Sequence, residues 1–194
     1  MVRVLPFGLA RIPAAKFEDL LRPHVDFLHR LAWRFTGSTA DAEDLVQDLL
    51  LKLYPRGRQL AAVEQLRPWL AKVLYRTYVD FARRQARSPV SGLAAGEEGN
   101  GNPLDAIPAT DDGPLELAER GERRQRIQAA LQRLNPEQRA VVVMHDIEGY
   151  VLEELESVLQ APLGTLKSRL HRARRQLRAD LGMEPFVAGE RVKP

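Results

Sequence analysis

One segment in the middle of the chain constrains the fold more than any other, because it carries too little apolar surface to pack. Residues 88–114 are rich in Gly, Pro, Asn, Ser and Asp, lack a sustained hydrophobic period, and carry acidic residues without basic ones. This composition predicts a flexible acidic linker. It divides the 194-residue chain into two domains, predicted at 16–87 and 115–182, and leaves an N-terminal extension at 1–15 and a C-terminal tail at 183–194.

The block before the linker repeats apolar residues at the spacing of a helix. The repeat runs through residues 17–35, through 41–53 after a cap at Ser38 or Thr39, and through 67–87. The sequence YPRGRQ, with its proline and glycine, is predicted to end the second of these helices and to begin a loop. No alternating strand pattern competes, so we predict an all-α domain.

The block after the linker is predicted to be all-α as well. A helix over 115–134 is followed by one that Asn135 caps and Gly149 closes. A short helix over 152–159 and a longer one over 163–178 come next, separated by a tight turn. Two helices joined in this way form a helix-turn-helix, whose second helix can enter the major groove of DNA.

The helix predicted over 163–178 is apolar on one face and basic on the others. Apolar residues return at alternating steps of three and four, and no acidic residue lies among the basic ones. Like charges at these spacings repel each other, and a polyanion would relieve the repulsion. A solvated helix is one alternative; a membrane-surface helix is another, although the large aromatic residues it would need are missing. The preceding helix and turn favour nucleic acid. Four residues in the first half of the helix are placed to meet base edges: Lys167, Ser168, His171 and Arg172.

Composition argues against several other functions. The chain has no cysteine, which excludes disulfides, thiol catalysis and cysteine-based zinc sites and fits a reducing compartment. His171 has no second ligand at a suitable spacing, so we predict no metal and no cofactor. We also find no phosphate loop, no nucleophile–base set, and no apolar run approaching about 20 residues. These observations predict a cytoplasmic protein that is not an enzyme and does not enter membranes.

The first domain carries an acidic helix and a basic one. Acidic residues fill the polar positions of residues 41–50, and basic residues line the helix over 67–87. Compensation of the helix dipole accounts for acids at a helix start and arginines at a helix end, but not for Lys72 and Arg76 near the start of theirs. The sharper hypothesis is two partners: a basic protein surface and a nucleic acid. Aromatic residues between the bases can stack on unpaired bases, although most are expected in the core.

Two stretches resemble bacterial RNA polymerase sigma factors of the extracytoplasmic-function (ECF) group. DAEDLVQDLLLKLY followed by LRPWLAKVLYRTYVDFARR is similar to their second conserved domain. LQRLNPEQRAVVVMHDIEGYVLEELESVLQAPLGTLKSRLHRARRQLRADL is similar to their fourth. The resemblance covers about 16–87 and 115–182 in the family's order. It implies a promoter-specificity subunit that acts on core RNA polymerase, has no catalysis of its own, and is held inactive by an anti-sigma protein.

The resemblance also implies which residues bind which partner. The clamp helices of core polymerase would dock on Asp44, Gln47 and Asp48. The loop at about 55–66 and the helix after it would melt promoter DNA and read the −10 element from an unstacked base. The residues expected to contact this DNA are Arg56, Arg58, Trp69, Lys72, Arg76, Arg83 and Arg84. The residues expected at the duplex −35 element are Thr165, Lys167, Ser168, His171, Arg172, Arg174 and Arg175. The acidic linker would follow the RNA path of the polymerase.

Four residues depart from the family's pattern. Val151 stands where a Ser or Thr usually caps the first helix of the helix-turn-helix, and the missing cap should cost about 1 kcal/mol. Gln160 replaces the usual glycine of the turn, which is unfavourable if the backbone there is left-handed. Glu156 replaces a small residue, and Leu66 stands where the family often has phenylalanine, so no −10 base preference carries over.

A self-standing helix-turn-helix regulator is the alternative function. Its first domain would sense a signal or dimerise. The acidic DAEDLVQD and the following RPWL argue against this alternative, because a stand-alone regulator needs neither.

Overall fold

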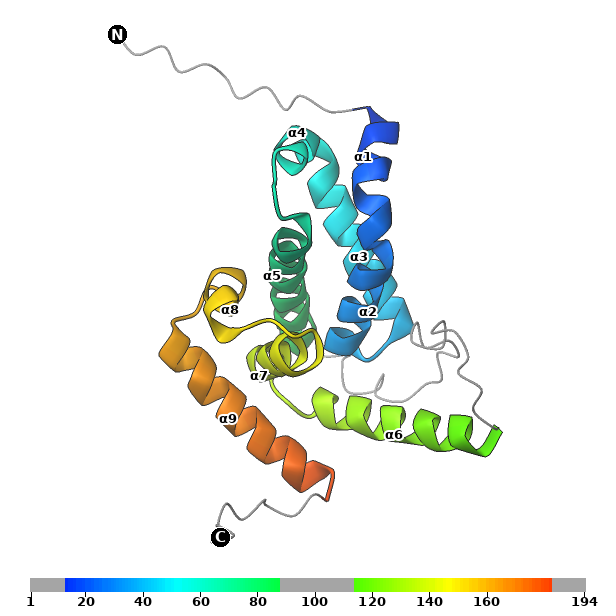
Figure 1. Ribbon diagram of the computed structural model, residues 1–194, viewed down its shortest axis with the longest axis vertical. Helices are drawn as coiled ribbons and strands as arrows, with labels where there is room; N and C mark the ends of the chain where they lie inside the picture. Colours follow the sequence, from blue (N-terminus) through cyan, green and yellow to red (C-terminus); the bar gives the residue numbers. More distant parts are fainter. Residues whose placement is uncertain (1–12, 88–113, 183–194) are drawn as a thin grey trace, which may run out of the picture. The chain divides into compact units, whose positions relative to one another are not determined.

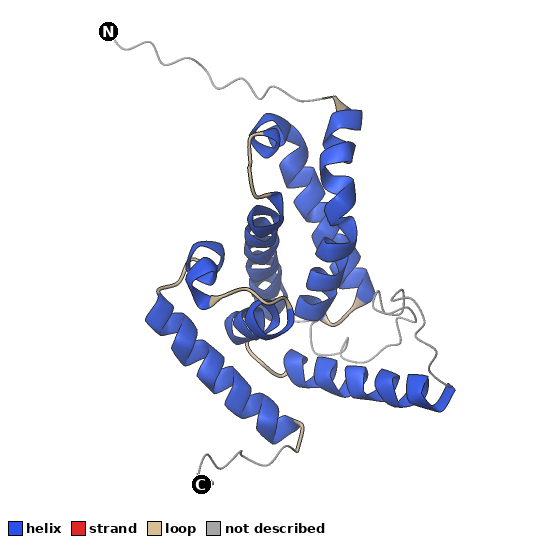
Figure 2. Cartoon of the chain, in the orientation of Figure 1, coloured by secondary structure: helices blue, strands red, loops and turns tan. Residues whose placement is uncertain are grey.

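The computed structural model describes residues 13–87 and 114–182, and both stretches are largely helical (Figure 1). These described residues contain no strand (Figure 2), which confirms the all-α prediction. The chain forms two compact units, which follow each other in sequence except that Ser157–Gln160 group with the first. The predicted C-terminal tail, and nearly all of the predicted linker and N-terminal extension, lie outside the described residues.

The first unit opens with a helix that a proline interrupts. α1 (Ala14–Leu21) leads through a 3-10 turn, η1 (Arg22–His24), into α2 (Val25–Thr36). The apolar periodicity over residues 17–35 predicts one uninterrupted run. Pro23 has no backbone N–H to continue the α-helical hydrogen bonding, so the run is divided there.

The next helix, α3 (Thr39–Leu53), begins at a cap that the sequence predicts. Gly37 ends the preceding helix in the left-handed region, at φ 78°. The Ser38 hydroxyl then accepts the backbone N–H of Asp41 at 3.2 Å. This bond satisfies one of the donors that a helix start leaves free, and it confirms the Ser38 cap.

The predicted loop after α3 is partly helical, which corrects the prediction. η2 (Tyr54–Arg56) and α4 (Gly57–Ala61) lie between α3 and α5 (Leu66–Arg87). The proline of η2 occupies a first-turn position, where its missing N–H costs nothing, and Gly57 has a helical φ of −54°. The chain therefore forms another helical turn, and Leu60 from that turn is buried.

Helices α2, α3 and α5 pack against one another and form the core of the first unit. The rings of Phe35 and Tyr78 stack with their centroids 4.8 Å apart. Of the aromatic residues between the bases of α5, Tyr75 and Tyr78 are buried in the core, whereas Trp69 and Phe81 are half-buried. The basic residues of α5 are thus carried on a helix whose opposite side is fixed by packing.

The second unit begins with α6 (Pro114–Gln132), which is joined to α7 (Pro136–Val142) by a short turn. The Asn135 side chain accepts the N–H of Gln138 at 2.8 Å, which confirms the predicted cap. The buried side chain of Arg139 donates to backbone carbonyl oxygens at the end of α6, at 2.8–3.1 Å. The last carbonyls of a helix have no donor in a following helical turn, so the arginine supplies donors to this helix end and to the turn after it, and ties the two helices together.

The helix after Asn135 does not stay α-helical as far as Gly149. It passes into a π-helical turn, η4 (Val143–Ile147), in which the N–H of Glu148 bonds to the carbonyl of Val143 at 2.9 Å. Gly149 closes the turn in the left-handed region at φ 80°, as a C-terminal glycine is expected to do.

The helix-turn-helix follows this turn. It consists of α8 (Leu152–Leu159) and α9 (Leu163–Asp180), which agree with the predicted ranges to within two residues (Figure 1). α7 packs along α9.

Candidate nucleic-acid interface

Helix α9 buries one face and exposes the others. Leu166, Leu170 and Ala173 are buried, whereas Leu163 and Leu177 near the two ends are half-buried. This confirms the predicted apolar face. Of the residues that the −35 prediction names, Thr165 is half-buried. The others are exposed: Lys167, Ser168, His171, Arg172, Arg174 and Arg175.

Two of the exposed residues are bonded along the helix. Arg172 Nε donates to the Ser168 carbonyl oxygen at 3.2 Å, and its guanidinium donates to the Ser168 hydroxyl at 3.3 Å. The Ser168 hydroxyl donates to the Thr165 carbonyl oxygen at 2.9 Å. The guanidinium has five donors in total, so further donors can reach a base edge or a phosphate. These bonds already restrict the Arg172 side chain, so it loses less conformational entropy when it binds DNA.

The turn between α8 and α9 is strained at one residue. Gln160 has a φ of 52°, in the left-handed region that glycine adopts without cost. The sequence predicts that glutamine is unfavourable at residue 160 if the backbone there is left-handed. The φ of Gln160 confirms that it is.

The start of α8 keeps half of a capping box. The Val151 backbone N–H donates to the Glu154 carboxylate at 3.1 Å. The reciprocal bond, from a side-chain oxygen at position 151 to a backbone N–H, cannot form because valine has no acceptor. The structure therefore supports the expected weak start, with one of two bonds retained.

The start of α9 is held by a residue from α8. Pro162 precedes α9 and makes no side-chain cap bond. The Glu156 carboxylate instead accepts the Leu163 N–H at 2.7 Å. A carboxylate at a helix start is favourable for both hydrogen bonding and the helix dipole. The sequence analysis noted Glu156 as a departure but missed this role; the signal was a proline in the cap position with an acid nearby across a tight turn.

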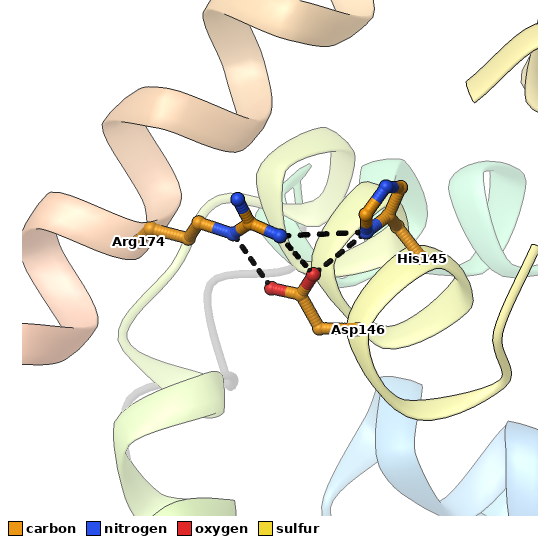
Figure 3. Close-up of polar contacts among 3 residues, drawn as sticks. All are labelled: His145, Asp146 and Arg174. Atoms are coloured by element: carbon orange, nitrogen blue, oxygen red, sulfur yellow. Dashed lines mark hydrogen bonds and ion pairs between the residues drawn. The ribbon is translucent and has the colours of Figure 1, made fainter. Parts of the chain in front are cut away.

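One residue predicted to contact DNA is engaged inside the second unit (Figure 3). Arg174 Nε donates to Asp146 Oδ2 at 3.0 Å, and a terminal nitrogen of the same guanidinium bonds to the other carboxylate oxygen. His145 Nδ1 lies 2.7 Å from Asp146 Oδ1. Asp146 belongs to the π-helical turn, so this cluster joins η4 to α9. The sequence analysis missed Asp146 entirely.

Asp146 and Arg174 shift each other's pKa values. Burial alone would raise the pKa of Asp146, but the hydrogen bonds and charges of Arg174 and His145 outweigh burial and hold that pKa below its usual range. The same bond to Asp146 raises the pKa of Arg174. Both residues are therefore ionised at neutral pH.

In the first unit, α3 presents the predicted docking residues on one face. Asp44, Gln47 and Asp48 are spaced three and one apart, which places them side by side on a helix. Asp44 and Gln47 are exposed, and Asp48 makes an ion pair with Arg84 of α5 at 3.4 Å. Burial, followed by the nearby charge of Asp44, raises the pKa of Asp41.

The residues predicted at the −10 element occupy α5 and the segment before it. Trp69, Lys72, Arg76 and Arg83 follow steps of three, four and seven, so they lie on one face of α5. Trp69 and Lys72 are half-buried, and the two arginines are exposed. Arg56, Arg58 and Arg84 are exposed as well.

Among the described residues, no group of three or more His, Asp or Glu side chains is placed to share a metal ion. No helix among them combines the length and the apolar character that a membrane crossing needs.

Models of two protein regions match the chain in order. Sigma-70 region 2 matches residues 20–88, and Sigma-70 region 4 matches residues 124–177. The ECF RNA polymerase sigma factor SigE of Mycolicibacterium smegmatis is 36% identical over 84% of this chain, which spans 60% of that relative's length. The ECF RNA polymerase sigma factor SigL of Mycobacterium tuberculosis is 32% identical, over 90% of this chain and 93% of its own length.

Solved structures show the same fold. The sigma factor RpoE from Bartonella quintana, crystallised with the anti-sigma factor NepR, has a TM-score of 0.64 at 24% identity and covers 89% of this chain and 100% of its own. CnrH, in complex with the cytosolic domain of CnrY, has a TM-score of 0.55 at 24% identity, over 87% and 89% of the two chains. Because SigL is more than 30% identical and is matched over nearly its whole length, this chain belongs to the ECF RNA polymerase sigma factors.

Proposed function

We propose that this protein binds core RNA polymerase and directs promoter-specific initiation of transcription. The observation that carries the proposal is the presence of both sigma regions in one chain, with region 4 ending in a recognition helix whose exposed faces are basic over 163–178. The chemistry of RNA synthesis then belongs to the polymerase, and this protein is not itself an enzyme. It works in the cytoplasm, where bacterial core polymerase meets the chromosome.

The first unit binds the polymerase through α3. Asp44, Gln47 and Asp48 form an acidic and amide face that suits a basic surface on the clamp helices. Asp48 and Arg84 form an exposed ion pair through a single contact. Such a pair contributes little to stability in water, so a binding partner can displace it.

The first unit also reads the −10 element. One face of α5 combines the half-buried ring of Trp69 with the charges of Lys72, Arg76 and Arg83. A cationic face with an aromatic ring suits a melted strand, since cations follow the phosphates and rings stack on unpaired bases. Arg56 and Arg58, just before this helix, extend the cationic surface.

The second unit reads the −35 element as duplex DNA. Thr165, Lys167, Ser168, His171 and Arg172 lie in the first half of α9, the part of a recognition helix that usually reaches base edges. Arg175 lies further along and is placed for the phosphate backbone.

A third partner covers these surfaces when the protein is inactive. RpoE was crystallised in complex with the anti-sigma factor NepR, and the structure of CnrH contains the cytosolic domain of CnrY. We infer an anti-sigma partner of the same class for this chain. Co-purification of the untagged partner with the tagged chain from unstressed cells would identify it, and a free, transcriptionally active chain in those cells would argue against it.

Run-off transcription with purified core polymerase tests the proposed function. We expect core alone to be silent on genomic promoter fragments and core with this protein to give discrete transcripts from a subset of them. If the protein neither binds core nor yields a transcript, the proposal is wrong. If it binds duplex fragments tightly without core and yields no transcript, the stand-alone regulator is correct instead.

A further inference from the structure

The contact between Arg174 and Asp146 points to a role other than DNA binding for this arginine. We propose that Arg174 and Asp146 are positioning residues, which fix the rotation of the recognition helix α9 on the π-helical turn η4 (Figure 3). This inference rests on the proposed function of α9 as the −35 reader. It reassigns Arg174, which the sequence resemblance places among the DNA contacts.

The geometry of the pair commits one edge of the guanidinium to the protein. Arg174 uses Nε and one terminal nitrogen on the two oxygens of Asp146, in the fork-to-fork arrangement that fixes both side chains. The Arg174 side chain is 46% exposed and that of Asp146 is 28% exposed, so the pair lies at the surface with its carboxylate partly covered. The other terminal nitrogen keeps its donors, but the edge of the guanidinium that faces Asp146 can bind a phosphate only after the carboxylate has been released.

The π-helical turn accounts for the position of Asp146. A π turn inserts one residue relative to an α-helix, which changes the direction of the side chains that follow. The insertion falls at Val143–Ile147, immediately at the end of the helix that packs along α9. It places Asp146 toward Arg174, although the two residues are 28 positions apart in sequence.

His145 holds the carboxylate from its other side. Its Nδ1 lies 2.7 Å from Asp146 Oδ1 and 3.5 Å from an Arg174 nitrogen. One nitrogen cannot donate to the carboxylate and accept from the guanidinium at once, so the shorter contact identifies Nδ1–H as a donor to Asp146. With both oxygens of Asp146 bonded, the carboxylate presents one fixed orientation to α9.

This orientation matters because most of the side chains that α7 and α9 bury are apolar, among them Val141, Val142, Leu166 and Leu170. Apolar packing holds the two helices together without directional bonds, whereas a bidentate ion pair has a defined geometry. The rotation of α9 about its axis decides which side chains face the DNA. A supporting bond of this kind is what keeps a recognition site within its productive geometry.

The test measures binding of holoenzyme to DNA at a series of salt concentrations. The probe is a duplex that carries the −35 half of a promoter recovered in run-off transcription and ends before the −10 element. The variants are R174A, D146A, the double variant, and R175A as a matched exposed arginine on the same helix. We expect R174A and D146A each to weaken binding by about tenfold, the cost of one misplaced base contact. The double variant should be no weaker than either single one, and all three should keep the wild-type salt slope.

Other results would overturn the inference. A salt slope reduced by about 0.9 in R174A, as expected for R175A, together with undiminished binding by D146A, would make Arg174 a direct phosphate contact. Wild-type affinity in both single variants, at a temperature where circular dichroism shows them folded, would leave the pair with a role in stability alone. R174K should fail to restore affinity, because lysine keeps the charge but not the fork; full rescue by lysine would also contradict the proposal. If the wild-type holoenzyme does not bind the −35 duplex, the result would instead count against the proposed function.

Discussion

Two aspartate–arginine pairs, one in each unit, use the same chemistry in different settings. Asp48 and Arg84 meet through a single contact of 3.4 Å, with side chains 45% and 63% exposed. Asp146 and Arg174 meet through both carboxylate oxygens and are more sheltered. Each pair joins two elements that are distant in sequence, and each includes residues that the sequence places at a binding surface.

The difference shows that proximity of opposite charges does not define one function. A single exposed pair contributes about 0–1 kcal/mol, so a partner can displace it at little cost. A bidentate pair with a third group bonded to its carboxylate holds its geometry and resists displacement. We therefore infer that the first pair lies on the proposed docking surface and that the second supports the proposed recognition helix.

The largest effect is expected when two exposed side chains of the proposed docking face on α3 are truncated. Asp44→Ala together with Gln47→Ala should weaken binding to core polymerase by at least about tenfold, because buried interface side chains dominate affinity. The free energy of unfolding should change by less than about 0.5 kcal/mol, since both side chains are exposed. Fluorescence anisotropy with labelled protein measures the first quantity, and urea unfolding measures the second.

A matched control for this double variant lies on α1. Asp19 is an exposed carboxylate whose nearest basic partner, Arg22, is 4.0 Å away. Asp19→Ala removes a negative charge from the same unit without touching α3, so its affinity for core should equal that of the wild type. Equal affinity in the α3 double variant and in Asp19→Ala would remove the docking assignment.

A direct comparison of the two pairs applies the same truncation to both. Asp146→Ala should lower the free energy of unfolding of the second unit by about 1.5 kcal/mol, because it removes two hydrogen bonds between charged groups. Asp48→Ala should lower that of the first unit by less than about 0.5 kcal/mol. Urea unfolding followed by circular dichroism gives both values, and two equal losses would contradict the distinction between the pairs.

The effect of Asp146→Ala should also depend on pH. The bonds to Arg174 and His145 hold the pKa of Asp146 below its usual range in the folded chain. The ionised carboxylate therefore stabilises the second unit above about pH 4, where an unfolded aspartate is ionised, and this contribution is lost as pH falls through the lower folded-state pKa. The stability difference between wild type and Asp146→Ala should be full at pH 7 and smaller at pH 3. A difference that grows toward low pH would show that the pKa shift has the opposite sign.

Features set by neighbouring residues could be predicted from the sequence. The caps at Ser38 and Asn135 depend on a side chain and a backbone N–H three positions on, and both are confirmed. The closing glycine at Gly149 depends only on its own backbone. The apolar face of α9 follows from the spacing of its leucines, because a helix repeats every 3.6 residues.

Features set by packing between elements could not be predicted in the same way. The bond from Glu156 to the start of α9 depends on the path of the intervening turn. The pairing of Asp146 with Arg174 depends on a π-helical turn, for which the hydrophobic spacing of α7 gives no signal. Arg174 consequently looks like any other arginine on a basic helix until the partner from η4 is known.

The turn that precedes α9 allows a smaller test of how the recognition helix is held. Gln160→Gly should raise the free energy of unfolding of the second unit by about 1 kcal/mol, because φ 52° is costly for any residue with a Cβ. Gln160→Ala keeps the Cβ and should give no such gain. Thermal unfolding measures both variants.

Combining this variant with the ion-pair variant sharpens the comparison further. If the turn and the pair hold α9 independently, the gain from Gln160→Gly and the loss from Asp146→Ala should add. A Gln160→Ala variant as stable as Gln160→Gly would show that the backbone relaxes at residue 160.

The smallest expected effect concerns the start of α8. Val151→Ser should raise the free energy of unfolding of the second unit by about 0.5 kcal/mol, because a serine oxygen can accept a backbone N–H while Glu154 keeps its bond to residue 151. Val151 is 52% exposed, so little packing is lost. Val151→Ala removes the same side chain without adding an acceptor and serves as the control. A serine variant no more stable than the alanine one would mean that the bond from Glu154 already satisfies this helix start, and that α8, like the Asp146 pair, depends on one well-placed carboxylate.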